Sequence, residues 1–118
     1  MRTTVKNFGP LPEWKETNTH LILAHFKEMC AKTAEAEDCL CDINVYYDYR
    51  WFQAAFMTDR FGGIAAILKY VEDERAYFLD GVGYATLDEA LCRVPKKVRE
   101  LTRKRDLKAV HEMIDAEY

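Results

Sequence analysis

Residues 43–81, INVYYDYRWFQAAFMTDRFGGIAAILKYVEDERAYFLDG, are rich in aromatic and β-branched residues, which favour strands. Four apolar runs, INVYYDY, WFQAAFMT, IAAILKYV and RAYFLDG, are separated by Tyr49-Arg50, Gly62-Gly63 and the acidic triplet 72–74. This pattern predicts an antiparallel β-meander of three or four strands over 43–81. The number stays open because RWFQAAFMTDRF would also suit a turn or two of helix.

The N-terminal third predicts one long helix. Residues 1–12 end in GPLP, whose prolines and glycine indicate an extended lead-in. Residues 13–36 are helical in pattern, because at 100° per residue their large apolar side chains fall within one broad sector. That sector contains Trp14, Leu21, Ile22, His25, Phe26, Met29 and Cys30. We expect this face to pack against another element.

The C-terminal third, 86–117, predicts two or three helices. Thr86 and Glu89 have capping-box spacing, which marks a helix start. The surrounding segment YATLDEAL is similar to the strand-to-helix transition of many small α+β domains, HicB-type antitoxins among them, and identifies no single family. Apolar residues then recur at steps of four and three along one helix face. They are Leu87, Leu91, Val94, Val98 and Leu101.

Two interruptions of this apolar stripe leave the number of helices open. At Pro95 either the helix kinks, or a second helix begins with proline in its first turn, where the missing N–H costs nothing. RKRD, 103–106, predicts a further break, because a continuous helix would rotate Arg105 onto the stripe. A last short helix, LKAVHEMIDAEY, would then present Leu107, Val110 and Ile114.

Together these elements predict a single α+β domain over 1–118. The chain has 118 residues, and 49% of them are hydrophobic, so one domain can bury a core without disulfides or metal. Helices covering one face of an antiparallel sheet would bury all the apolar faces together.

The positive charge is concentrated in one segment. Residues 93–108, RVPKKVRELTRKRDLK, contain eight Lys or Arg against two acids, although the whole chain has a net charge of −3. On a helix Lys96, Arg99 and Arg103 lie within roughly 60° of each other and opposite the apolar stripe, with Lys97 and Lys104 beside them. Such a basic ridge suits phosphates. It is also an ordinary solvated helix face, in which Glu100 can pair with Lys96 and Lys104.

Aromatic residues supply a second set of candidate contacts. Tyr47, Tyr49 and Trp51 could stack on nucleobases or anchor a protein interface. The ordinary alternative is packing within the sheet. Because strand side chains alternate between faces, only some of the three can be exposed.

The sequence contains few signs of catalytic or metal chemistry. It has no serine, which excludes a serine nucleophile. The alternative of a zinc site would use Cys39, Cys41 and either Cys30 or Cys92, but no second close pair follows at zinc-knuckle spacing. Acidic neighbours of the Cys39-x-Cys41 pair would raise a thiol pKa, which argues against a cysteine nucleophile. We expect no enzyme activity and no cofactor.

We therefore expect a cytosolic, non-enzymatic binding protein. The opening MRTTVKNFGP has no signal-peptide core, and no window is long and apolar enough to span a membrane. The expected partner is another protein, with this chain as its regulator or inhibitor, including of a protein that processes nucleic acid. The alternative is a nucleic-acid-binding module that uses the basic helix 93–108. If the chain self-associates, we expect a symmetric dimer at an unpaired sheet edge.

Overall fold

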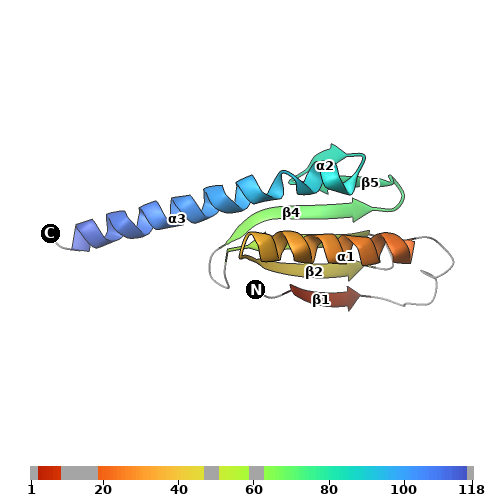
Figure 1. Cartoon of the computed structure of the whole chain (residues 1–118), viewed down its shortest axis with the longest axis horizontal. Coiled ribbons are helices and arrows are strands. Elements are labelled where there is room, and N and C mark those ends of the chain that lie inside the picture. Colours follow the sequence, from red (N-terminus) through yellow and green to blue (C-terminus); the bar gives the residue numbers. More distant parts are fainter. Residues whose placement is uncertain (1–2, 9–18, 47–50, 59–62, 117–118) are drawn as a thin grey trace.

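The protein is an α+β domain with six strands and three helices in the part of the chain that its computed structural model describes, residues 3–8, 19–46, 51–58 and 63–116 (Figure 1). The elements in chain order are β1 (Thr3–Phe8), α1 (Thr19–Ala36), β2 (Leu40–Tyr46), β3 (Trp51–Met57), β4 (Ile64–Val71), β5 (Ala76–Leu79), β6 (Val82–Tyr84), α2 (Leu87–Leu91) and α3 (Val94–Ala116). The predicted α+β class and the order of helix, meander and helices are therefore confirmed.

The six strands form one sheet in the order β1-β2-β3-β4-β5-β6. Strands β2 to β6 are an antiparallel meander, and β1 pairs in parallel with β2 from the opposite side. The expected three or four strands were too few, since the meander has five. β1 lies within 1–12, where the sequence predicted an extended lead-in.

The extra strand β6 follows from a two-residue turn. Asp80 and Gly81 have φ angles of 49° and 86°, and two positive angles in succession give the turn whose twist matches an antiparallel hairpin. The register confirms the hairpin, because Leu79 pairs with Val82 directly across it. RAYFLDG is thus a strand and a turn, after which the chain returns along β5.

All three helices contribute to a core on one face of the sheet. Alternate residues of the strands are buried there, as the period of two in a half-buried strand requires. At its centre Phe52 on β3 meets Phe26 on α1, with ring centroids 4.7 Å apart, and Tyr70 on β4, 5.0 Å away. The opposite face of the sheet carries no helix of the described chain (Figure 1).

Helix α1 ends at Ala36 as expected, and residues 13–18 of its predicted span lie outside the described residues. The face that it buries differs from the predicted one by a rotation of roughly 90°. Its buried residues are Thr19, Leu23, Phe26, Cys30 and Ala34, whereas Leu21 is 60% exposed. Phe26 and Cys30 belong to both faces, whereas the predicted face does not include Leu23 and Ala34. The small side chain of Ala34 lets the helix lie close to the strands.

The structure has two C-terminal helices, α2 and α3, and so decides between the kink and the second helix that the sequence left open at Pro95. Thr86 is the N-cap of α2, and its Oγ1 accepts a hydrogen bond of 3.3 Å from the N–H of Glu89, as the capping box predicted. Pro95 stands in the first turn of α3, so a second helix begins there.

The predicted break at RKRD is wrong, because α3 continues from Val94 to Ala116. The reason is that α3 runs past the end of the sheet (Figure 1), so the apolar stripe needs no burial there. Arg105 can therefore stay exposed, and its Nη1 donates to Thr58 Oγ1 at 2.8 Å.

Candidate functional site

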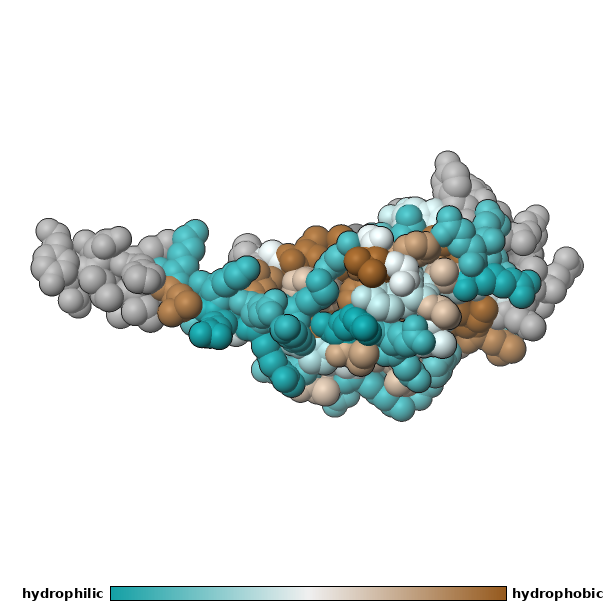
Figure 2. All heavy atoms as spheres, turned by 90° about the horizontal axis from the view of Figure 1, so that it is seen from above, coloured by the Kyte–Doolittle hydropathy of each residue, from teal (hydrophilic) through white to brown (hydrophobic). Residues whose placement is uncertain are grey.

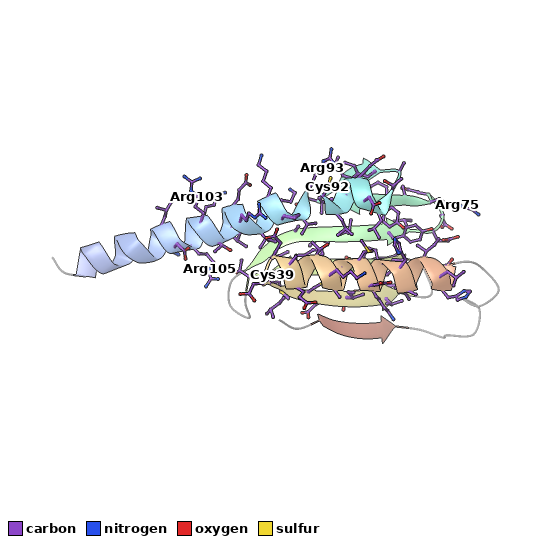
Figure 3. The ribbon with its side chains drawn as sticks, viewed as in Figure 1. Cys39, Arg75, Cys92, Arg93, Arg103 and Arg105 are labelled. Atoms are coloured by element: carbon purple, nitrogen blue, oxygen red, sulfur yellow. The ribbon has the colours of Figure 1, made fainter. Side chains whose placement is uncertain are left out.

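The basic ridge of Lys96, Arg99 and Arg103 lies on the exposed side of α3, opposite the buried Val98. The side chain of Lys96 is 84% exposed, and its Nζ lies 4.0 Å from a carboxylate oxygen of Glu100. Within the described residues Arg103 and its neighbour Lys104 have no ion-pair partner. Arg103 and Arg105 extend from opposite sides of the helix (Figure 3).

Arg99 and Lys97 each form an ion pair with a carboxylate of the same chain. Arg99 binds the carboxylate of Glu37 through two nitrogens, Nη2 at 2.8 Å and Nε at 3.3 Å, and the Glu37 side chain is only 12% exposed. Lys97 Nζ lies 2.8 Å from Asp80 Oδ2. The hydrogen bond that Lys97 donates to the Asp80 carboxylate raises the pKa of Lys97. These pairs attach α3 to the end of α1 and to the β5–β6 turn.

Arg93 also has a structural role, at the junction of α2 and α3 (Figure 3). Its Nη1 donates to the carbonyl oxygen of Glu89, which satisfies an acceptor at the end of α2. Its guanidinium lies 4.6 Å above the ring of Tyr84. The cations that remain available for a partner on the outer side of α3 are therefore Lys96, Arg103 and Lys104.

Of the aromatic candidates only Trp51 lies within the described residues, since Tyr47 and Tyr49 fall in 47–50. Trp51 stacks on Tyr46 with ring centroids 3.9 Å apart, and Lys69 Nζ lies 4.3 Å from the Trp51 ring centroid. Because its neighbour Phe52 points into the core, Trp51 points to the other side of the sheet, here called the open face. The structure therefore places Trp51 and the basic ridge on different surfaces.

The open face has a hollow that sequence reasoning did not find. It measures about 450 Å³ and lies over β4 and β5. The register brings Lys69 opposite Phe78 and Val71 opposite Ala76 across these strands. The lining residues are Ile67, Lys69, Val71, Glu74, Phe78, Asp80 and Gly81. The alternation of residues in the strand IAAILKYV could have predicted which side chains line this hollow, because every second residue points away from the core.

The cysteines occupy two environments. Cys30, Cys39 and Cys41 are buried, whereas Cys92 is exposed where α2 meets α3 (Figure 3). Burial raises the pKa of the Cys30 thiol well above its usual value, with a further contribution from Cys41. Burial raises the pKa of Cys39 to about 11, with smaller contributions from the charges of Cys41, Glu37 and Asp38. Such thiols are protonated at neutral pH and are poor nucleophiles and metal ligands.

In the described ranges, no three His, Cys, Asp or Glu side chains form a group that could hold a metal ion. Across the same residues, no helix has the combination of length and apolar composition that crossing a membrane requires. Comparisons with protein-family models, with curated proteins and with solved structures give no match. Two surfaces of the described chain remain as candidates for function, the basic ridge and the open face.

Proposed function

We propose that this protein acts by binding another protein, as its regulator or inhibitor, and that the open face of the sheet is the contact surface. The observation that carries the proposal is the chemical character of this face. An antiparallel sheet that faces water on one side normally presents polar residues there. Here the open face, which no helix of the described residues covers, also presents Tyr46, Trp51, Val71 and Phe78, with Ile67 in the hollow.

The arrangement of these residues fits a protein interface. Tryptophan and tyrosine are enriched among the residues that dominate binding energy, and they act best inside a polar rim that excludes water. Asn44, Gln53 and Glu74 provide polar groups around the aromatic pair and the hollow. The stacking of Trp51 against Tyr46 and Lys69 holds its ring in one orientation before a partner arrives, which lowers the entropic cost of binding.

Affinity capture from the source cells tests this function, with the full chain as bait. The variant Trp51→Ala removes an aromatic side chain of the open face, and the control Leu21→Ala removes a large apolar side chain that is 60% exposed on α1. We expect one protein to be retained by the wild type and by Leu21→Ala and lost with Trp51→Ala. Calorimetry with the purified partner should then show at least about a tenfold loss of affinity for Trp51→Ala. Equal retention by both variants would refute the open face as the contact surface.

A second candidate function is nucleic-acid binding by the basic ridge together with the adjacent Lys104. The exposure of Lys96, Arg103 and Lys104 favours it. Three phosphate contacts would make log K fall with log salt at a slope of about −2.7 on duplex DNA, or roughly 40-fold from 50 to 200 mM. Arg103→Glu/Lys104→Glu should abolish this binding. Lys27→Glu/Lys32→Glu on α1 changes the net charge equally and should retain most of it. No binding at low salt, or equal losses in both variants, would remove this candidate.

A further inference from the structure

The C-terminal part of α3, residues 102–116, is here called the arm. Every described side chain of the arm, from Thr102 to Lys108, is exposed, and Leu107 is 52% exposed. Figure 2 shows mostly hydrophilic residues along this helix and a hydrophobic spot just before its grey end. At 1.5 Å per residue the arm is about 22 Å long. None of its described side chains is buried, so packing does not stabilise this part of α3, and a partner would stabilise the arm.

The charges of the arm are ordered along its length. Its first half, 102–108, contains Arg103, Lys104, Arg105 and Lys108 against the single carboxylate of Asp106. Its second half, 109–116, contains Glu112 and Asp115 and neither lysine nor arginine. This order opposes the helix dipole, which favours cations near the C-terminus, and α3 has no basic residue in its last turn. The charge pattern therefore does not suit a helix that stands alone.

We propose that the arm pairs with the arm of a second copy of this chain in antiparallel orientation. This pairing places the basic half of each arm along the acidic half of the other, and it opposes the two helix dipoles. A parallel pair would instead bring like charges together. The sequence also has the apolar spacing that a helix pair needs, because Leu107, Val110 and Ile114 follow one another at steps of three and four within a continuous helix.

The expected dimer is weak and sensitive to salt. Two segments of about four turns bury less than the roughly 1,200 Å² of a standard interface, so the dissociation constant should be on the order of 10–100 µM. Exposed charges are screened within about 10 Å at 0.1 M salt, so added salt should weaken an antiparallel pair. Added salt should instead strengthen a parallel pair, because it would screen the repulsion between like charges. The arm is separate from the open face, so this inference stands or falls independently of the proposed function.

Sedimentation velocity of the full chain, from about 1 µM to about 1 mM, tests the pairing across that range of affinity. We expect the wild type to shift from monomer to dimer and the shift to weaken with salt. Arg103→Glu/Lys104→Glu makes both halves of the arm acidic, and Glu112→Lys/Asp115→Lys makes both halves basic. Each variant should remain monomeric alone. An equimolar mixture of the two should form a heterodimer, because each acidic half of one arm then faces a basic half of the other.

Two controls keep the result interpretable. Lys27→Glu/Lys32→Glu has the same net charge as the acidic-arm variant but leaves the arm intact, so it should dimerise like the wild type. Leu107→Lys, at an exposed position that folding does not require, should weaken the dimer at least about tenfold. Unchanged melting curves would show that all variants fold. A monomeric wild type at the highest concentration, a dimer that tightens with salt, or a mixture that stays monomeric would each overturn the proposal.

Discussion

The carboxylate of Asp80 connects three parts of the molecule, and its ion pair with Lys97 joins the β5–β6 turn to helix α3. Oδ2 lies 2.8 Å from Lys97 Nζ, while Oδ1 accepts a hydrogen bond of 2.9 Å from the backbone N–H of Ile67 on β4. The backbone of Asp80 has a positive φ of 49°, which aspartate and asparagine tolerate better than most residues. Turn geometry, a strand amide and a helix contact thus depend on one side chain.

The two functions of the Asp80 side chain can be separated by substitution. Asp80→Asn keeps an acceptor for Ile67 and tolerates the positive φ, so it should lose only the exposed ion pair, about 0.5 kcal/mol of unfolding free energy. Asp80→Ala removes the acceptor as well and strains the backbone, so it should lose about 2–3 kcal/mol. Urea denaturation measures both values. Equal losses would show that the Ile67 hydrogen bond contributes little.

Tyr70 should make the protein sensitive to alkaline pH. Its Oη donates to Glu72 Oε2 at 2.7 Å, and the residue is 3% exposed. Burial first, and the Glu72 carboxylate second, hold the pKa of Tyr70 well above its usual value near 10. A raised folded-state pKa means that this contribution to stability is complete below pH 10 and is lost as the pH rises toward the folded value.

Tyr70→Phe therefore has two expected effects. At pH 8 it should lower the free energy of unfolding by about 1 kcal/mol, because the hydrogen bond to Glu72 is gone. Above pH 10 its stability should fall less steeply than that of the wild type, so the two curves converge. Urea denaturation at pH 8, 10 and 11 measures this. Parallel curves over the whole range would show that Tyr70 does not titrate on unfolding.

Local patterns were sufficient to predict most of the elements. The apolar runs of 43–81 predicted the meander, and the Thr86 capping box predicted the start of α2. β6 was not expected, although Asp80-Gly81 is a strong hairpin signal, because Val82–Tyr84 is only three residues long and has a glycine at its centre. β1 was missed because its pairing with β2, some forty residues away, is not encoded in its own sequence.

The surfaces were less predictable than the elements. That Trp51 faces away from the core follows from strand alternation once Phe52 is placed inside. The pairing of Arg99 with Glu37 spans 62 residues and depends on where α1 ends relative to α3, which no local pattern specifies. The exposure of Arg105 likewise depends on the sheet being shorter than α3.

The four cysteines should react with thiol reagents in two classes. Cys92 is exposed, whereas Cys30, Cys39 and Cys41 are at most 2% exposed. Burial also raises the pKa values of Cys30 and Cys39, so little thiolate is present at pH 8. We expect one rapid and three slow equivalents with a colorimetric disulfide reagent, the slow ones reacting at the rate of unfolding. Cys92→Ala should abolish the rapid phase; a second rapid thiol in this variant would contradict the buried arrangement.

The Arg99–Glu37 pair should contribute more to stability than its exposed position on α3 suggests. The arginine side chain is 73% exposed, but the glutamate is 12% exposed and is held by two nitrogens of the guanidinium. Arg99→Ala leaves a largely buried carboxylate without its partner, so it should lower the free energy of unfolding by about 1–2 kcal/mol. Lys96→Ala removes a neighbouring cation whose pair is long and exposed, and it should change stability by less than about 0.5 kcal/mol. Thermal and urea denaturation at neutral pH compare the two. If both variants are equally stable, Arg99 is as available for a partner as Lys96, and all three ridge residues should then be tested together in the binding experiments.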